Sequence, residues 1–293
     1  MSVDLTITQK RIFKKTLPLC VILGDKLRYG VPGEGNCLEP GKTGDGCLIL
    51  YLPDAIGRGF SITWTLNEMN KVDLRLLTPT CTAEIREFYN TVARITKYWN
   101  GELCVEGYIE KPDEWLAGMG EFILFNKQAL NTYARKVADG EEKYYVLNCA
   151  LWPLVMGREE AQKFVDHPAA FDAWLHEKQS IDAYYAAPRF SIVDGEVIGR
   201  LMLAEDYTTI LPLNPIVPVG MKDPRTGKEL KCSKYIVVLC SFTEKLLGNV
   251  YIEEIAELLP AGKYCRFDEN CILIQKLSND EITAMLRKIS GNE

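Results

Sequence analysis

The sequence contains only two histidines, His167 and His176, among 293 residues. Any Ser–His or Cys–His mechanism would have to use one of these two side chains. They stand too far apart in the sequence to be metal ligands one helical turn apart. His176-Glu177 begins a zinc-protease pattern, but Ser180 occupies the position of its second histidine. We therefore predict no metal site and expect Asp172 and His176 to form an exposed pair on the polar side of a helix.

Long apolar runs are also missing, since no stretch has the roughly 20 apolar residues that a membrane-spanning helix needs. The run Leu17–Leu23 follows a basic segment and imitates a signal peptide, but it contains Pro18. Asp25 then stands where a small residue should mark cleavage. Alternating apolar residues in Val3–Ile7 already predict a strand. We expect a structural N-terminus, no membrane association and a cytoplasmic protein.

No Cys-x-x-Cys pair occurs, although the chain has ten cysteines. They are scattered, and several stand in apolar runs, where free cysteine behaves as a small buried hydrophobe. Disulfide frameworks are typical of short secreted chains, so we expect reduced thiols. Cys265 and Cys271 flank a predicted turn, but two thiols do not make a zinc site, which needs four ligands. The sequence therefore predicts neither a metal nor another cofactor.

The chain has no excess of basic residues, since 34 Lys and Arg stand against 40 Asp and Glu and the net charge is −6. Surfaces that neutralise phosphates are strongly basic, so we expect no nucleic-acid partner. The same acidic field attracts cations and favours a basic protein as partner. A catalytic pair of carboxylates would leave no signature among so many acidic residues. No catalytic residue can therefore be assigned from the sequence.

Strand and helix patterns occur in groups rather than in strict alternation, which favours an α+β fold with mainly antiparallel sheets. Period-two alternation and compact apolar runs predict strands at Val3–Ile7, Leu19–Leu23, Leu48–Leu52, Gly59–Thr65, Lys71–Leu77, Leu103–Ile109, Lys143–Met156 and Tyr235–Cys240. Helical periodicity predicts helices at Thr82–Tyr98, Glu121–Val137, Arg158–Lys178 with a break at Pro168, Val250–Leu259 and Ser278–Ile289.

Turn residues predict three hairpins. Asp194-Gly195 stands between two apolar runs, and further hairpins are expected at Asp223–Gly227 and over Lys263–Gln275. Ser278 and Glu281 form a capping box for the last helix. Each half of the chain holds several strands and at least one amphipathic helix. We therefore expect two subdomains of similar kind, residues 1–140 and 141–293, or a single domain spanning both.

Residues 24–46 are rich in glycine and poor in apolar residues, which predicts a long loop. Within it, Gly41-Lys42-Thr43 matches the end of a phosphate-binding loop. The opening glycine of that motif would have to stand where the sequence has Asn36, and a strand rather than a helix is predicted to follow. We expect a turn-rich loop rather than a nucleotide site.

Cys81 stands at the start of the predicted helix Thr82–Tyr98, where the helix dipole could favour a thiolate. Arg86 comes one position too early for the arginine of a cysteine-phosphatase loop. Glu87 occupies that position and would repel a phosphate. The alternative is that Cys81 packs beneath the helix, and we favour it.

Tyrosines cluster at Tyr144-Tyr145 and at Tyr184-Tyr185, the second pair close in sequence to Arg189 and Phe190. Aromatic residues with arginine are typical of interaction hot spots. They are also common in half-buried strands, which is the interpretation we favour.

The segment from Leu48 to Trp99 resembles an uncharacterised bacterial family whose members have about this length. The resemblance rests on Leu50–Pro53, Gly57–Trp64, Val72–Pro79 and Ile85–Tyr89. These are mainly structural positions, so the resemblance implies no functional residues. It implies a bacterial, cytosolic setting and no known activity.

Three functions remain open. The first, which we favour, is a non-enzymatic binding or regulatory protein, because the sequence completes none of the catalytic motifs considered above and the chain is acidic. The second is a hydrolase or transferase that uses carboxylates or Cys81, with the glycine-rich segment as a lid. The third is a small-molecule sensor with a pocket between two α+β halves.

Overall fold

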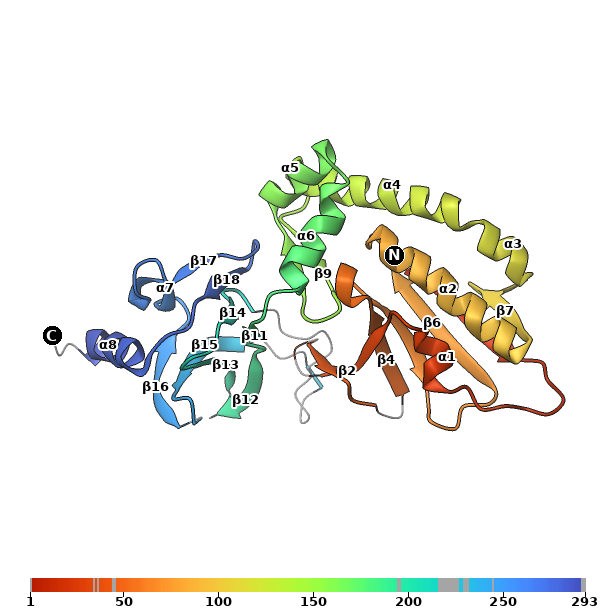
Figure 1. The fold of residues 1–293 in the computed structure, drawn as a ribbon. Helices are drawn as coiled ribbons and strands as arrows, with labels where there is room; N and C mark the ends of the chain where they lie inside the picture. Colours follow the sequence, from red (N-terminus) through yellow and green to blue (C-terminus); the bar gives the residue numbers. More distant parts are fainter. Residues whose placement is uncertain are drawn as a thin grey trace. The chain divides into compact units, whose positions relative to one another are not determined.

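The computed structural model describes residues 2–33, 35, 37–43, 46–193, 196–215, 227–228, 232–243 and 245–290 (Figure 1). The chain divides into two compact units, Met1–Ile181 and Asp182–Glu293. Both combine helices with mainly antiparallel sheets, so the predicted α+β class is confirmed. Their architectures differ, because the first is built on one large sheet and the second on two small ones.

The first unit contains an eight-stranded sheet in the order β3-β2-β4-β5-β6-β1-β7-β8, with all neighbours antiparallel. On β1, Leu5 and Ile7 are buried, whereas Asp4 and Thr6 point to the opposite face. The strands are β1 (Ser2–Gln9), β2 (Arg28–Pro32), β3 (Leu38–Pro40), β4 (Gly46–Tyr51), β5 (Phe60–Trp64), β6 (Lys71–Leu77), β7 (Gly101–Val105) and β8 (Tyr108–Glu110).

Helix α2 (Thr82–Trp99) covers one face of this sheet, with α1 (Leu19–Leu23) beside it (Figure 1). The core between α2 and the sheet contains the apolar stripe predicted for the helix and the inward residues of the central strands. These buried side chains include Ile85, Phe88, Val92, Ile95 and Trp99 from α2 and Leu5, Ile7, Ile62 and Leu74 from the strands. The predicted helix is confirmed.

Further helices pack outside α2. Trp115 of α3 (Pro112–Ala117) stacks on Tyr89 of α2 with ring centroids 4.1 Å apart. Helix α4 (Met119–Ala138) contacts both α2 and α5 (Arg158–Asp166), and α6 (Ala170–Gln179) follows α5. Two short strands, β9 (Tyr145–Leu147) and β10 (Leu154–Met156), pair with each other. Because α5 packs on α4 and in turn contacts α6 and β10, the first compact unit extends past Gly140 to Ile181.

The second unit contains two four-stranded sheets, β11-β14-β18-β17 and β12-β13-β15-β16. Both surround one apolar core with α7 (Ile255–Leu258) and α8 (Asn279–Ser290). The strands are β11 (Tyr184–Tyr185), β12 (Arg189–Val193), β13 (Glu196–Ala204), β14 (Thr209–Pro212), β15 (Cys232–Cys240), β16 (Leu246–Tyr251), β17 (Tyr264–Arg266) and β18 (Cys271–Ile274).

Two of the three predicted hairpins are visible in this unit. Strands β12 and β13 pair antiparallel, and so do β17 and β18. The turn residues Asp194-Gly195 and most of the predicted hairpin at Asp223–Gly227 lie outside the described residues. The capping box of α8 is confirmed, since the backbone N–H of Ser278 donates to Glu281 and that of Glu281 donates to the Ser278 hydroxyl.

The segment Leu17–Pro40 was predicted wrongly. Leu19–Leu23 is the helix α1 and not a strand, because Pro18 starts a helical turn that ends at Gly24, whose φ is +56°. The expected loop at residues 24–46 contains β2 and β3. Gly30 belongs to that pairing, because a Cβ there would lie 2.5 Å from the backbone oxygen of Glu39.

Three other element predictions need correction. Lys143–Met156 is two strands rather than one, and Leu103–Ile109 is the hairpin of β7 and β8, which turns at Glu106 and Gly107 with positive φ at both. The expected helix Val250–Leu259 begins with the end of β16, and only Ile255–Leu258 is helical. Val250 is held in the strand by pairing with Val237 of β15.

Candidate functional site

The face of the eight-stranded sheet opposite α2 carries polar side chains. The outward positions of β1, β5 and β6 alternate with residues buried against α2. They line a hollow of about 630 Å³. The polar side chains in this lining are Asp4, Thr6, Ser61, Thr63, Asp73, Arg75, Cys104 and Glu106. An open sheet face of this kind meets water or a polar partner rather than a second apolar layer.

This hollow, here called the acidic hollow, has three carboxylates and one guanidinium in its lining. The Thr6 hydroxyl donates to Asp73 at 2.5 Å, and the backbone N–H of Asp4 donates to Glu106 Oε1 at 2.8 Å. Arg75 Nε lies 3.4 Å from Asp4 Oδ1. Lys71, outside the lining, also pairs with Asp73, its Nζ 3.7 Å from Asp73 Oδ2. Three carboxylates against these two cations leave the hollow with a net negative charge, which attracts cationic groups.

A second cavity of about 340 Å³ opens on the same face and shares Ser61 and Arg75 with the acidic hollow. It is called the Arg58 cavity below. Its other lining residues are Ile49, Arg58, Gly59, Phe60, Leu77 and Asn148. Two arginines and no carboxylate line it, so its charge is opposite to that of the acidic hollow.

Arg58 is only 7% exposed. Its Nε donates to the backbone oxygen of Asn148 and its Nη1 to that of Pro79, both at 3.0 Å. Burial lowers the pKa of the Arg58 guanidinium, and nearby groups, Glu84 among them, oppose that shift. Within the described residues no carboxylate forms an ion pair with Arg58. The residue therefore joins two segments while its charge lacks a direct counter-ion.

Glu84 of α2 is fully buried and holds the segment that precedes β5. Its Oε1 accepts the backbone N–H groups of Gly57 at 3.0 Å and Gly59 at 2.8 Å. Its Oε2 accepts the N–H of Arg58 at 2.9 Å and the Thr80 hydroxyl at 2.6 Å. Burial raises the pKa of the Glu84 carboxyl, while these four hydrogen bonds oppose the rise. Both carboxylate oxygens are thus occupied by the protein.

Cys81 packs at the start of α2 and is 2% exposed. Its Sγ lies 3.8 Å from the backbone oxygen of Ala55. Burial raises the pKa of the Cys81 thiol well above its usual value, and the charges of Glu84 and Asp172 raise it further. A thiol in this environment stays protonated and hidden, so the geometry favours the packing role over that of a nucleophile.

The expected exposed pair of Asp172 and His176 is wrong. Asp172 accepts the backbone N–H of Thr82 at 3.0 Å and so caps α2 from the neighbouring helix. His176 Nδ1 accepts the N–H of Ile56 at 3.1 Å. Both side chains are half-buried and accept backbone N–H groups from other segments of the first unit, which the periodicity of α6 alone could not reveal.

The Gly41-Lys42-Thr43 segment is a turn at the end of β3. Gly41 has a φ of +71°, and its N–H donates to the backbone oxygen of Tyr29 at 2.8 Å. Lys42 forms an exposed ion pair with Glu39 at 2.6 Å. Strand β4 begins at Gly46, so the helix that a phosphate-binding loop requires does not follow.

Cys265 and Cys271 lie in one hairpin but do not face each other, because Cys265 is opposite Leu273 in the register. Cys271 is buried, whereas Cys265 is exposed. Burial raises the pKa of the Cys271 thiol well above its usual value, and the charge of Asp268 raises it further. Among the described residues, no group of three or more His, Cys, Asp or Glu could hold a metal ion.

The two tyrosine pairs have different surroundings. Tyr145 stacks on Tyr133 with ring centroids 4.4 Å apart, inside the first unit. In the second unit, Tyr184, Arg189 and Phe190 come together in the lining of a cavity of about 320 Å³. Most of the other lining is apolar, apart from Ser191 and Arg200, which are hydrogen bonded to each other.

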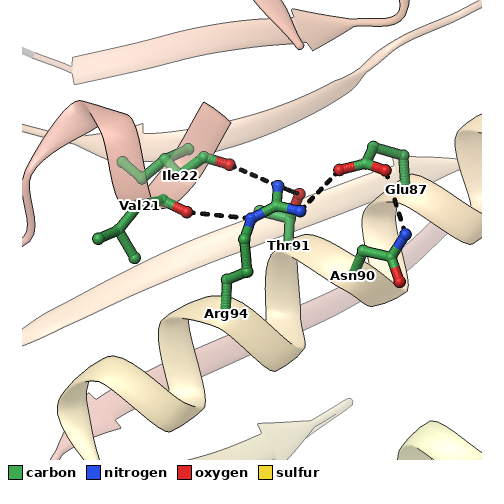
Figure 2. Close-up of polar contacts among 6 residues, drawn as sticks. All are labelled: Val21, Ile22, Glu87, Asn90, Thr91 and Arg94. Carbon is green, nitrogen blue, oxygen red and sulfur yellow. Dashed lines mark hydrogen bonds and ion pairs between the residues drawn. The ribbon is translucent and has the colours of Figure 1, made fainter. Parts of the chain in front are cut away.

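A polar cluster around Arg94 on α2 is structural (Figure 2). Its guanidinium donates to the backbone oxygens of Val21 and Ile22 at 3.1 and 2.9 Å and pairs with Glu87 at 2.7 Å. The Thr91 hydroxyl accepts a further hydrogen bond at 2.8 Å. Arg94 thereby donates hydrogen bonds to carbonyl groups at the C-terminal end of α1, and Glu87 balances its charge.

The sequence prediction missed Arg58 and Glu84. Both stand in ordinary positions, one between two glycines and one in the first turn of a helix, so no spacing marks them. The only signal was Gly57-Arg58-Gly59 itself, where a Cβ on Gly57 would lie 2.1 Å from Cys81 Sγ. A charged residue flanked by two glycines that allow close approach indicates a tightly held segment.

A family model described as a domain of unknown function (DUF4299) matches residues 2–285. Since the match covers nearly the whole chain, the chain belongs to this uncharacterised family. No curated protein and no solved structure matches the chain. Across the described residues, none of the helices is long and apolar enough to cross a membrane.

Proposed function

We propose that this member of the DUF4299 family is a non-enzymatic binding protein of the bacterial cytoplasm, whose acidic hollow receives a basic segment of a partner protein. The observation that carries the proposal is the charge of the open sheet face, where Asp4, Asp73 and Glu106 outnumber Arg75. Lysine or arginine side chains of a partner would gain charge-assisted hydrogen bonds there.

The rest of the chain is consistent with such a role. A net charge of −6 adds long-range attraction for a basic surface and speeds encounter. The same charge repels nucleic acid. Neither histidine lines the acidic hollow. Its one thiol, Cys104, shares that lining with no histidine and with a single arginine, Arg75. The acidic hollow therefore offers recognition groups rather than an activated nucleophile.

The test compares two triple variants. Asp4→Asn, Asp73→Asn and Glu106→Gln together neutralise the acidic hollow, while Glu121→Gln, Glu141→Gln and Glu142→Gln remove three exposed carboxylates elsewhere. Binding of a fluorescent oligolysine and of an oligoglutamate of equal length is measured by anisotropy at low and high salt.

We expect oligolysine to bind the parent at low salt, and we expect added salt to weaken this binding. The first triple variant should bind several-fold more weakly than the second, because only the first alters the field at the acidic hollow. Equal binding by the two variants would contradict the proposal, and so would a preference for oligoglutamate. A partner captured from a native lysate should show the same order of affinities.

The cavity of the second unit supports a second candidate, a small-molecule sensor. Its mainly apolar lining with two arginines suits an apolar molecule that carries an acidic group. A thermal-shift screen of aromatic and aliphatic acids would detect such a ligand, and Met202→Trp should abolish the shift by filling the cavity. A screen without any shift that depends on Met202 would remove this candidate.

A further inference from the structure

We infer that the Arg58 cavity is a binding site for a small oxyanion, a carboxylate or a phosphate group, distinct from the acidic hollow beside it. The first support is the missing counter-ion. A buried cation costs free energy unless a negative group lies close to it. Glu84 acts on the Arg58 guanidinium through space only, because its two oxygens accept hydrogen bonds from three backbone N–H groups, that of Arg58 among them, and from the Thr80 hydroxyl.

The second support is an unused edge of the guanidinium. Nε and Nη1 of Arg58 donate to backbone oxygens, but Nη2 has no acceptor in the described part of the chain. Nη2 is also not enclosed by the protein. In the described part of the chain, the fully enclosed polar side-chain atoms that lack a hydrogen-bond partner are Thr78 Oγ1 and Trp152 Nε1, and Nη2 is not one of them. Its donors are therefore accessible to a ligand in the cavity that Arg58 lines.

The third support is a second guanidinium in the same lining. Arg75 uses Nε toward Asp4 and Nη2 toward Ser2, and its Nη1 has no acceptor among the described residues. Two arginines that keep donors for the same space match the several oxygens of a carboxylate or phosphate. The Ser61 residue adds a hydroxyl to the lining.

A purely structural role for Arg58 is the competing interpretation. As a clamp it joins the segments at Pro79 and Asn148 and needs no ligand. The two interpretations differ at Arg75, which is largely exposed and whose hydrogen-bond and ion-pair partners among the described residues are Ser2 and Asp4, outside those segments. Replacing Arg75 should leave a clamp intact and weaken an oxyanion site.

The experiment titrates the full-length protein with sodium phosphate and with sodium malonate by calorimetry, at constant ionic strength set with sodium chloride. We expect one saturable site for phosphate, malonate or both. Arg75→Gln should weaken it about tenfold, because a charge-assisted hydrogen bond is lost. Arg86→Gln, an exposed arginine on the helix that covers the opposite face, should bind like the parent.

The outcome also separates this site from the acidic hollow. Arg75→Gln removes the one cation in the lining of that hollow and should strengthen oligolysine binding while it weakens oxyanion binding. Arg58→Lys keeps the positive charge but loses the planar set of N–H donors of the guanidinium. In a variant whose melting temperature matches that of the parent, this change should also weaken oxyanion binding. The inference is overturned if neither anion binds saturably, or if Arg75→Gln binds them as tightly as Arg86→Gln does.

Discussion

Gly57 lies in the segment before β5, in close contact with the start of α2. Its N–H donates to Glu84, and its backbone oxygen accepts the N–H of Ala150 at 3.0 Å. A Cβ at this position would lie 2.1 Å from Cys81 Sγ and 2.8 Å from Glu84 Oε2. Only a residue without a side chain allows these hydrogen bonds.

Gly57→Ala should therefore destabilise the protein by about 3 kcal/mol, because the buried neighbours cannot move away without breaking hydrogen bonds. Urea unfolding measures the effect. Gly120→Ala is the matched control, since a Cβ there meets nothing within 4 Å, and it should be neutral or slightly stabilising. In a Cys81→Ala background the cost of Gly57→Ala should fall, because Sγ is gone. An unchanged cost would show that the sulfur does not limit this contact.

Single residues also mark the limit of what the sequence could predict about the site. The packing role of Cys81 and the absence of a helix after Thr43 followed from spacing alone. Asp172 and His176 were placed wrongly, because helical periodicity orients a side chain relative to its own helix and not to the polar backbone of a distant segment. The roles of Arg58 and Glu84 depend on their burial, and that burial arises only when segments far apart in the sequence pack together.

At the scale of elements, α2 was predictable because its apolar stripe runs from Ile85 to Trp99 and is buried. Val92→Asp should destabilise the protein by about 4 kcal/mol or prevent folding, since Val92 has no exposed surface and the new charge would have no partner. Arg86→Asp, on the exposed side of the same helix, is the control. If Val92→Asp melts at the same temperature as the parent and the control, this packing of α2 is disproved.

Short elements were not predictable in the same way. Five residues such as Leu19–Leu23 fit a strand and a helical turn equally well, and the glycines of residues 24–46 indicated a loop although Gly30 allows two strands to pair. Val250 belongs to a strand because β15 offers it a partner. Long periodic segments carry their own signal, whereas short ones take their structure from neighbours that are distant in the sequence.

The start of α8 gives a pH dependence with a defined sign. Glu281 accepts the N–H of Ser278 and pairs with Lys263, and these contacts lower the pKa of the Glu281 carboxyl. A lowered pKa in the folded state stabilises the protein above the usual value of 4.5, and the contribution is lost as the pH falls through the lowered pKa.

Between neutral pH and about 3, the parent should therefore lose more stability than Glu281→Gln does. Urea midpoints at several pH values measure the difference. Glu253→Gln, which changes another exposed carboxyl of the second unit, should follow the parent. Parallel curves for the parent and Glu281→Gln would mean that the capping contacts do not form in solution.

At the scale of the whole molecule, the division between Ile181 and Asp182 was not predictable from composition. Asp139-Gly140 ends α4 and has the composition of a linker. The elements beyond it nevertheless belong to the first unit, because their side chains complete the polar contacts at the start of α2. Asp172 of α6, for example, accepts the backbone N–H of Thr82 at 3.0 Å.

Two fragments distinguish these boundaries. Residues 1–181 contain the eight-stranded sheet, its helices and the buried groups that join them, so this fragment should fold and unfold cooperatively. Residues 1–140 lack Asp172, the acceptor for Thr82, and leave the buried surface of α4 without α5. This shorter fragment should aggregate or melt without cooperativity, because apolar and polar groups lose their partners together. Circular dichroism melts of both fragments provide the measurement. Cooperative unfolding of residues 1–140, with residues 1–181 no more stable, would place the boundary where the sequence suggested it.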